Sequence, residues 1–109
     1  MVKGAIKRIV DRYCIELANM GIHVENVLMY GSQARKKAHE DSDIDLIVIS
    51  PDWKPLSLRE RLEILGVASA RILEPVQANG FTPEEISSHK LMPFWEHILR
   101  EQAVPVVLD

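Results

Sequence analysis

Two aspartates separated by one residue, Asp43 and Asp45, stand at the start of an apolar run that continues to Ile49. Side chains two positions apart on a β-strand project from the same face. The two carboxylates would therefore lie side by side, where their charges repel unless water or a cation neutralises them. Magnesium prefers such oxygen ligands and completes its shell with water and substrate phosphates. The pair predicts a divalent-cation site, with a solvated turn as the ordinary alternative.

A glycine and a serine, Gly31 and Ser32, end a preceding apolar run, and Arg35 follows one helical turn later. Glycine permits a sharp turn and a close approach of the backbone to a ligand. The serine hydroxyl and the free amides of a following helix can donate to phosphate oxygens. Arg35 could add a charge-assisted contact or be an ordinary surface residue. Together with the aspartates, this turn predicts a site for a metal-bound nucleoside triphosphate.

The two motifs, GSQAR at 31–35 and SDIDL at 42–46, resemble those of the nucleotidyltransferase domain of the DNA polymerase β superfamily. The length and layout of the chain are similar to the minimal (MNT) domains of that superfamily. The resemblance implies a polymerase β-like fold in which Gly31, Ser32 and Arg35 hold the triphosphate. It also implies that Asp43 and Asp45 bind two Mg²⁺ ions, with ATP or another nucleoside triphosphate as substrate.

The family completes this site with a third carboxylate on a later strand, which binds metal and helps to activate the attacking hydroxyl. The chain has no aspartate between Asp52 and Asp109, so Glu74 is the best-placed substitute. Glu74 could equally be a surface residue of its strand. Lys36 is a second departure, because the family commonly has glycine there. If Glu74 lies outside the site, the resemblance implies nucleotide binding with weak catalysis.

The hydrophobic pattern predicts alternating helices and strands in one α/β (α+β) domain over residues 1–109, a small mixed sheet flanked by helices. Helices are expected over 3–20, 33–38, 58–71, from 83 and over 93–102, and strands over 24–30, 43–50, 72–78 and 104–108.

Inward-facing positions can also be predicted for two of the helices. The helix over 58–71 is expected to carry its apolar side chains along one inner side, at Leu58, Leu62, Leu65 and Ala68 or Ser69. The helix over 93–102 is expected to direct Phe94, Ile98 and Leu99 inward. Trp53 could stack on a base, although packing within the protein is the more common fate of such a residue.

Composition limits the partners and the location. A chain of 109 residues suits one domain, and its net charge of -3 gives no general attraction to nucleic acid or to an anionic membrane. A single cysteine, Cys14, excludes an intrachain disulfide. No segment has the pattern of a signal peptide or a membrane span. These features lead us to expect a cytoplasmic protein without a membrane partner.

The resemblance implies a Mg²⁺-dependent nucleotidyltransferase that moves a nucleoside monophosphate, expected to be AMP from ATP, to a hydroxyl acceptor. The acceptor could be a side chain of a partner protein, a small molecule or an RNA end, and the acidic charge makes a long polynucleotide the least expected of these. Minimal domains of this kind often work beside a small helical HEPN protein. An alternative is therefore an antitoxin that binds a HEPN-type toxin with weak or no catalysis. A third is a degenerate domain that senses nucleotide. The oligomeric state and the base preference stay open.

Overall fold

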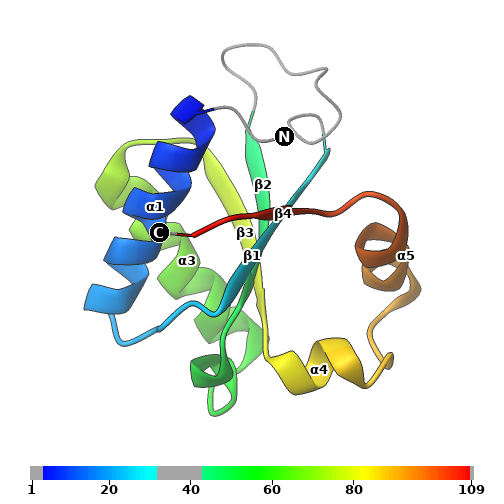
Figure 1. Cartoon of the computed structure of the whole chain (residues 1–109). Coiled ribbons are helices and arrows are strands. Elements are labelled where there is room, and N and C mark those ends of the chain that lie inside the picture. Colours follow the sequence, from blue (N-terminus) through cyan, green and yellow to red (C-terminus); the bar gives the residue numbers. More distant parts are fainter. Residues whose placement is uncertain (1–3, 32–42, 109) are drawn as a thin grey trace.

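The computed structural model describes residues 4–31 and 43–108, which form a four-stranded mixed sheet with helices on both faces (Figure 1). The fold is thus the small mixed α+β fold that the sequence predicts. Its elements are α1 (Gly4–Asn19), β1 (Asn26–Tyr30), β2 (Ile44–Ile49), η1 (Pro51–Trp53), α3 (Leu58–Ile72), β3 (Val76–Phe81), α4 (Pro83–Ser87), α5 (Pro93–Glu101) and β4 (Val104–Val106).

The strand order is β3-β2-β1-β4. β1 pairs antiparallel with both β2 and β4, whereas β2 pairs parallel with β3 through the crossover helix α3. In register, Tyr30 of β1 lies opposite Asp45, and Asp45 lies opposite Gln77 of β3. The start of β2 is therefore flanked by the end of β1 and the start of β3.

One face of the sheet carries the larger core, beneath α1 and α3. Tyr13 of α1 is fully buried, and its hydroxyl donates to the Leu65 carbonyl at 2.8 Å. Trp53 is also fully buried, and its indole N–H donates to the Val48 carbonyl at 3.1 Å. Trp53 therefore packs within the protein, which was the more common of its two expected roles. It is enclosed too completely to stack on a base.

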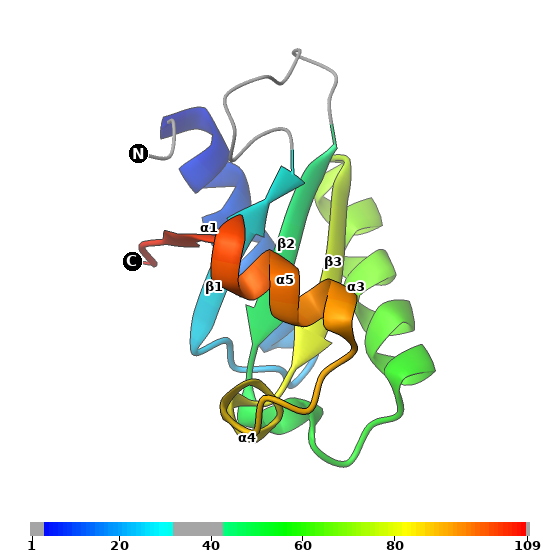
Figure 2. The ribbon, with the colours of Figure 1, turned by 90° about the vertical axis from the view of Figure 1, so that its right-hand side faces the viewer.

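The opposite face is crossed by α5 (Figure 2). Ile47, Ile49, Phe81 and Ile98 form the buried cluster there, and Trp95 packs against it. Nearer the start of β2, the same face carries polar side chains, because the alternation that turns Ile47 toward α5 also turns Asp45 to this side. Along this face, β2 thus changes from apolar side chains beneath α5 to a carboxylate at its start.

The strand predicted over 72–78 is displaced along the chain. Helix α3 continues through Ile72, and Leu73 ends it in the left-handed conformation at φ 57°. Glu74 and Pro75 form the connection, and β3 begins at Val76. Ile72 is buried against the core, so packing extends the helix beyond its predicted end. Glu74 consequently lies before the strand rather than within it.

The buried stripe of α3 runs through Arg61, Leu65, Ala68 and Ile72. The inward position predicted for Leu65 is correct. The positions predicted for Leu58 and Leu62 are wrong, because these side chains are 65% and 50% exposed. In α5, Ile98 is buried as predicted, whereas Phe94 is 56% exposed.

The inner face of α3 also carries a buried arginine. The Arg61 guanidinium lies 2.7 Å from Glu85 and also donates to the carbonyls of Leu56 and Gly80. Burial raises the pKa of Glu85, but hydrogen bonds from Arg61 and from the Thr82 amide outweigh it and hold that pKa below its usual value. Arg61 is therefore a satisfied structural charge that ties α3 to α4.

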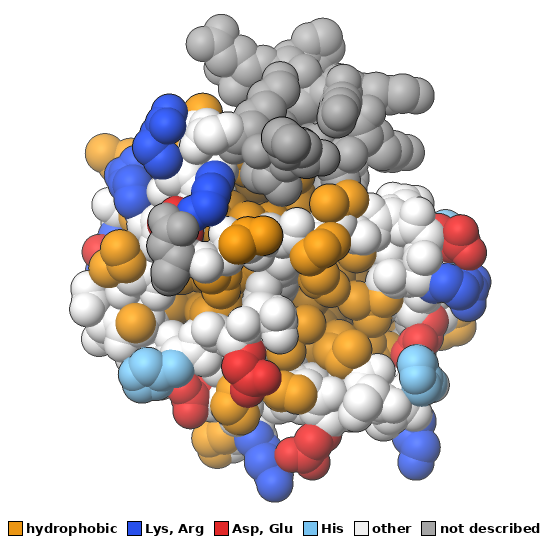
Figure 3. All heavy atoms as spheres, viewed as in Figure 1, with side chains coloured by type: hydrophobic (Ala, Val, Ile, Leu, Met, Phe, Trp, Pro, Cys, Tyr) orange, Lys and Arg blue, Asp and Glu red, His pale blue; other side chains and the backbone are white. Residues whose placement is uncertain are grey.

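The surface that carries β4 is rich in hydrophobic side chains, which gather between α1 and α5 (Figure 3). Val107, just beyond β4, is 76% exposed. Among the described residues, no helix is long and apolar enough to cross a bilayer.

Candidate nucleotide and metal site

The end of β1 brings a glycine turn directly against one of the aspartates. Tyr30 pairs with Asp45, and Gly31 follows with φ 75°, a left-handed conformation that favours glycine. A Cβ atom added at Gly31 would lie only 2.5 Å from Oδ2 of Asp45. Both the backbone conformation and the proximity of the carboxylate therefore require glycine here. The structure brings together these two parts of the predicted site.

The paired aspartates project from the same side of the chain at the start of β2. Asp43 precedes the strand and is exposed, whereas Asp45 is partly buried. Burial, and then the negative charge of Asp43, raise the pKa of Asp45. The folded protein thus holds two neighbouring carboxylates whose mutual repulsion a cation would relieve. Their hard oxygen atoms suit Mg²⁺.

Two amide side chains of β3 extend the site across the sheet. Gln77 lies opposite Asp45, and its Nε2 donates to Oδ2 of Asp43 at 2.8 Å. Asn79 hydrogen-bonds Tyr30, which lowers the pKa of that phenol. Burial and then the charge of Asp45 outweigh this bond, so the pKa of Tyr30 is raised overall. Gln77 therefore gives Asp43 a neutral donor, whereas Asn79 contacts Tyr30 rather than an aspartate.

Sequence reasoning missed Gln77 and Asn79 because it placed the third strand too early. Their alternation about Ala78 in the segment VQANGF indicates a shared face of a strand. The parallel pairing with β2 then sets Gln77 beside the aspartates. The pairing could not be read from the sequence.

Glu74, the predicted third carboxylate, lies in the connection between α3 and β3. Its Oε1 is 3.8 Å from Nη1 of Arg12 on α1, and its carbonyl accepts from the Ser69 hydroxyl at 2.7 Å. Within residues 4–31 and 43–108, no three histidine, cysteine or acidic side chains are grouped to hold a metal ion. The structure therefore does not unite Glu74 with the aspartate pair. Ser32 and Arg35 lie outside the described residues.

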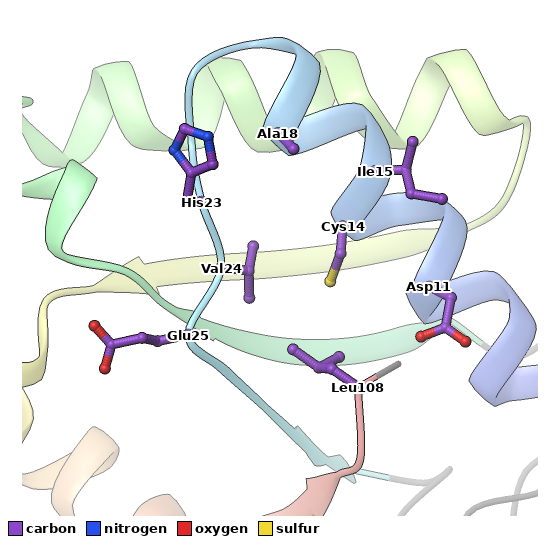
Figure 4. Close-up of a pocket in the computed structure, with 8 residues that line it drawn as sticks. All are labelled: Asp11, Cys14, Ile15, Ala18, His23, Val24, Glu25 and Leu108. Carbon is purple, nitrogen blue, oxygen red and sulfur yellow. The ribbon is translucent and has the colours of Figure 1, made fainter.

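A different pocket, of about 530 Å³, lies where α1 meets the start of β1. Figure 4 shows the Cys14 side chain of α1 pointing toward Val24 and Leu108. Burial, and then the charge of Asp11, raise the pKa of the Cys14 thiol to about 11. The thiol is thus protonated at neutral pH and is a poor nucleophile. This pocket is at the opposite end of β1 from Gly31, so it does not belong to the aspartate site.

The fold and the glycine–aspartate arrangement define a nucleotidyltransferase-like domain. Residues 7–92 match the family model of the nucleotidyltransferase domain. This match spans most of the chain, and the protein belongs to the nucleotidyltransferase domain family.

Solved structures with the same fold agree with this assignment. One is a candidate nucleotidyltransferase from Sulfolobus solfataricus, with 21% identity, a TM-score of 0.57, and coverage of 77% of this chain and 73% of the other. Another is a toxin–antitoxin structure with AMP-PNP, with 17% identity, a TM-score of 0.58, and coverage of 91% and 73%. At these identities the likeness concerns the fold. No curated protein gives a significant match.

Proposed function

We propose that this protein uses a divalent metal to transfer AMP from ATP to a hydroxyl group on a partner protein. The observation that carries the proposal is the contact between Gly31 and Asp45, which sets a metal-binding carboxylate against the turn expected to hold phosphate. Membership of the nucleotidyltransferase domain family supports the same reaction class. The toxin–antitoxin structure of similar fold contains AMP-PNP, which favours an adenine nucleotide.

Each residue has a defined part in the proposed reaction. Asp43 and Asp45 would hold the cation, and Gly31 would let the backbone approach the phosphates. Ser32 and Arg35 stay predicted phosphate ligands. Bound magnesium would neutralise phosphate charge and stabilise the departing pyrophosphate.

The acceptor oxygen forms a bond to the α-phosphorus of ATP, and the bond from that phosphorus to the β-phosphate oxygen breaks. Pyrophosphate leaves, and the hydroxyl proton passes to solvent. Glu74 is left out of this proposal because its carboxylate faces Arg12 rather than the aspartate pair.

The direct test is transfer of label from [α-³²P]ATP in the presence of Mg²⁺ and the product of an adjoining HEPN-type gene. We expect labelled partner with the natural protein, and no label above background with Asp43→Asn or Asp45→Asn. Asp52→Asn is the matched control, because Asp52 lies beyond the other end of β2 and contacts His23. Transfer that survives both aspartate changes would overturn the site assignment.

A second candidate function is that of an antitoxin that acts by binding alone. The observation in its favour is a pocket of about 510 Å³ whose lining includes Leu58, Met92 and Trp95. Leu58 and Met92 are 65% and 66% exposed, and Phe94 nearby is 56% exposed. Large apolar side chains grouped on a surface are typical of a site that binds another protein.

The two functions make different predictions for the same variants. If binding alone is the function, the Asp43→Asn/Asp45→Asn protein will still bind and neutralise the HEPN-type partner. Leu58→Glu will then weaken binding, measured by calorimetry. Val67→Glu is the control, because Val67 is 43% exposed on the same helix but does not line the pocket. Neutralisation that requires both aspartates would favour the transferase.

A further inference from the structure

Gln77 is the one side chain of β3 that reaches the aspartate pair by a direct hydrogen bond. It lies opposite Asp45 in the parallel register, and its Nε2 donates to Oδ2 of Asp43 at 2.8 Å. Strand pairing therefore gives this side chain the position next to both aspartates. The side chain is a neutral amide of the same length as glutamate.

Two features of this arrangement bear on metal binding. First, the amide proton occupies an oxygen of Asp43 that a cation would otherwise use, so the amide must turn before that oxygen can bind a metal ion. Second, an amide supplies an oxygen ligand without a negative charge. Two divalent ions held about 4 Å apart repel each other strongly, and carboxylates between them reduce that repulsion.

We propose that Gln77 occupies the third position of the metal site and limits it to a single divalent ion. The inference rests on the proposed function and deepens it. Asp43 and Asp45 provide charge for the ion that accompanies the nucleotide phosphates, and the turned Gln77 amide adds at most a neutral oxygen. A second ion beside the acceptor hydroxyl lacks a carboxylate to hold it. The protein therefore binds metal–nucleotide well and transfers the nucleotide slowly.

The test counts metal ions directly. Mn²⁺ is titrated into the full chain with saturating AMP-PNP, and the free ion is measured by electron paramagnetic resonance. We expect one Mn²⁺ per chain for the natural protein and for Gln77→Ala, and two for Gln77→Glu. Gln77 is exposed, so these substitutions leave the core intact, which circular dichroism will verify. With labelled ATP, Gln77→Glu should raise transfer by about 10- to 100-fold.

Asn79→Asp is the matched charge control, because it adds the same charge to the same face of β3 next to Tyr30. We expect it to leave the count at one. Glu74→Gln should also leave the count at one, and a lower count would make Glu74 the third ligand and overturn the inference.

Two Mn²⁺ ions in the natural protein, or one in Gln77→Glu, would equally refute it. Absence of any nucleotide-dependent Mn²⁺ binding would instead refute the proposed function itself.

Discussion

Replacing Gly31 with alanine tests the contact on which the site depends. Gly31 has φ 75°, and an added Cβ would lie 2.5 Å from Oδ2, 3.4 Å from Cγ and 3.6 Å from Cβ of Asp45. The first of these distances is too short for any real pair of such atoms. Either the backbone of the turn or the Asp45 side chain must move. Both movements change the position of the carboxylate relative to the turn.

The cost of this substitution can be approximated from its two parts. An L-residue in the left-handed region costs about 1–2 kcal/mol. Displacing a side chain from its preferred rotamer costs about 1 kcal/mol. We therefore expect Gly31→Ala to lower the free energy of unfolding by about 2–3 kcal/mol. For a domain of this size, the loss corresponds to a fall in Tm of roughly 10–20 °C.

Urea unfolding followed by circular dichroism measures the stability change, and Gly66→Ala provides its control. Gly66 lies within α3, and an added Cβ there meets nothing within 4 Å. Alanine at this helical position should raise the free energy of unfolding by about 0.5–1 kcal/mol. The two glycine-to-alanine changes are thus expected to have opposite signs.

Nucleotide binding then separates a structural role of Gly31 from a functional one. Calorimetry with Mn²⁺ and AMP-PNP, at a temperature where both proteins are folded, should show weaker binding by Gly31→Ala than by the natural protein. Unchanged stability would refute the geometric argument. Reduced stability with unchanged affinity would show that the Gly31–Asp45 contact serves the fold alone.

Three further substitutions test the charges and packing of β2, β3 and α4. Asp45→Asn should raise the free energy of unfolding at pH 7 without metal. The folded-state pKa of Asp45 is raised, so the ionised carboxylate destabilises the fold as pH rises through that pKa. The gain in the free energy of unfolding should vanish below pH 3.8, and Mn²⁺ with AMP-PNP should reverse it, because the ions bind only the natural carboxylate. Glu85→Gln should cost about 3 kcal/mol in urea unfolding, because it leaves buried Arg61 without its counter-charge. The natural protein should lose this contribution as pH falls below 4.5, since the folded-state pKa of Glu85 is lowered. Gly80→Ala should lower Tm by the equivalent of about 1–3 kcal/mol, because its Cβ would lie 2.6 Å from the buried Trp53 ring; an unchanged Tm would contradict that packing.

Local signals were sufficient to predict much of this fold. Ser57 and Thr82 each cap a helix through a complete capping box, with Glu60 and Glu85 as the reciprocal partners. These motifs act within three residues, so the sequence displays them in full. The apolar run at β2 likewise identifies a central strand covered on both faces.

The errors arise where a partner is distant in the sequence. Arg61 is buried because it meets Glu85, 24 residues away, whereas its neighbour Leu62 is 50% exposed. Sequence patterns place leucine on the inner face of a helix and arginine on the outer face, and only a distant partner such as Glu85 reverses the expectation for an arginine. Similarly, Gln77 lies beside Asp43, which is 34 residues earlier in the chain, only because β2 pairs with β3.

Charged side chains are neutralised by the protein at one end of β3 but not at the other, and this difference supports a cation site at the aspartates. At the Phe81 end, buried Arg61 is matched by Glu85 and by the Gly80 carbonyl, so the protein supplies its own neutralisation. At the Val76 end, Asp45 carries a raised pKa beside Asp43, and the hydrogen bond from Gln77 brings no positive charge. Repulsion between the two carboxylates lowers the free energy of unfolding unless a cation binds between them. A metal ion that accompanies the nucleotide would remove this repulsion, and the free energy released on its removal would strengthen binding of the ion.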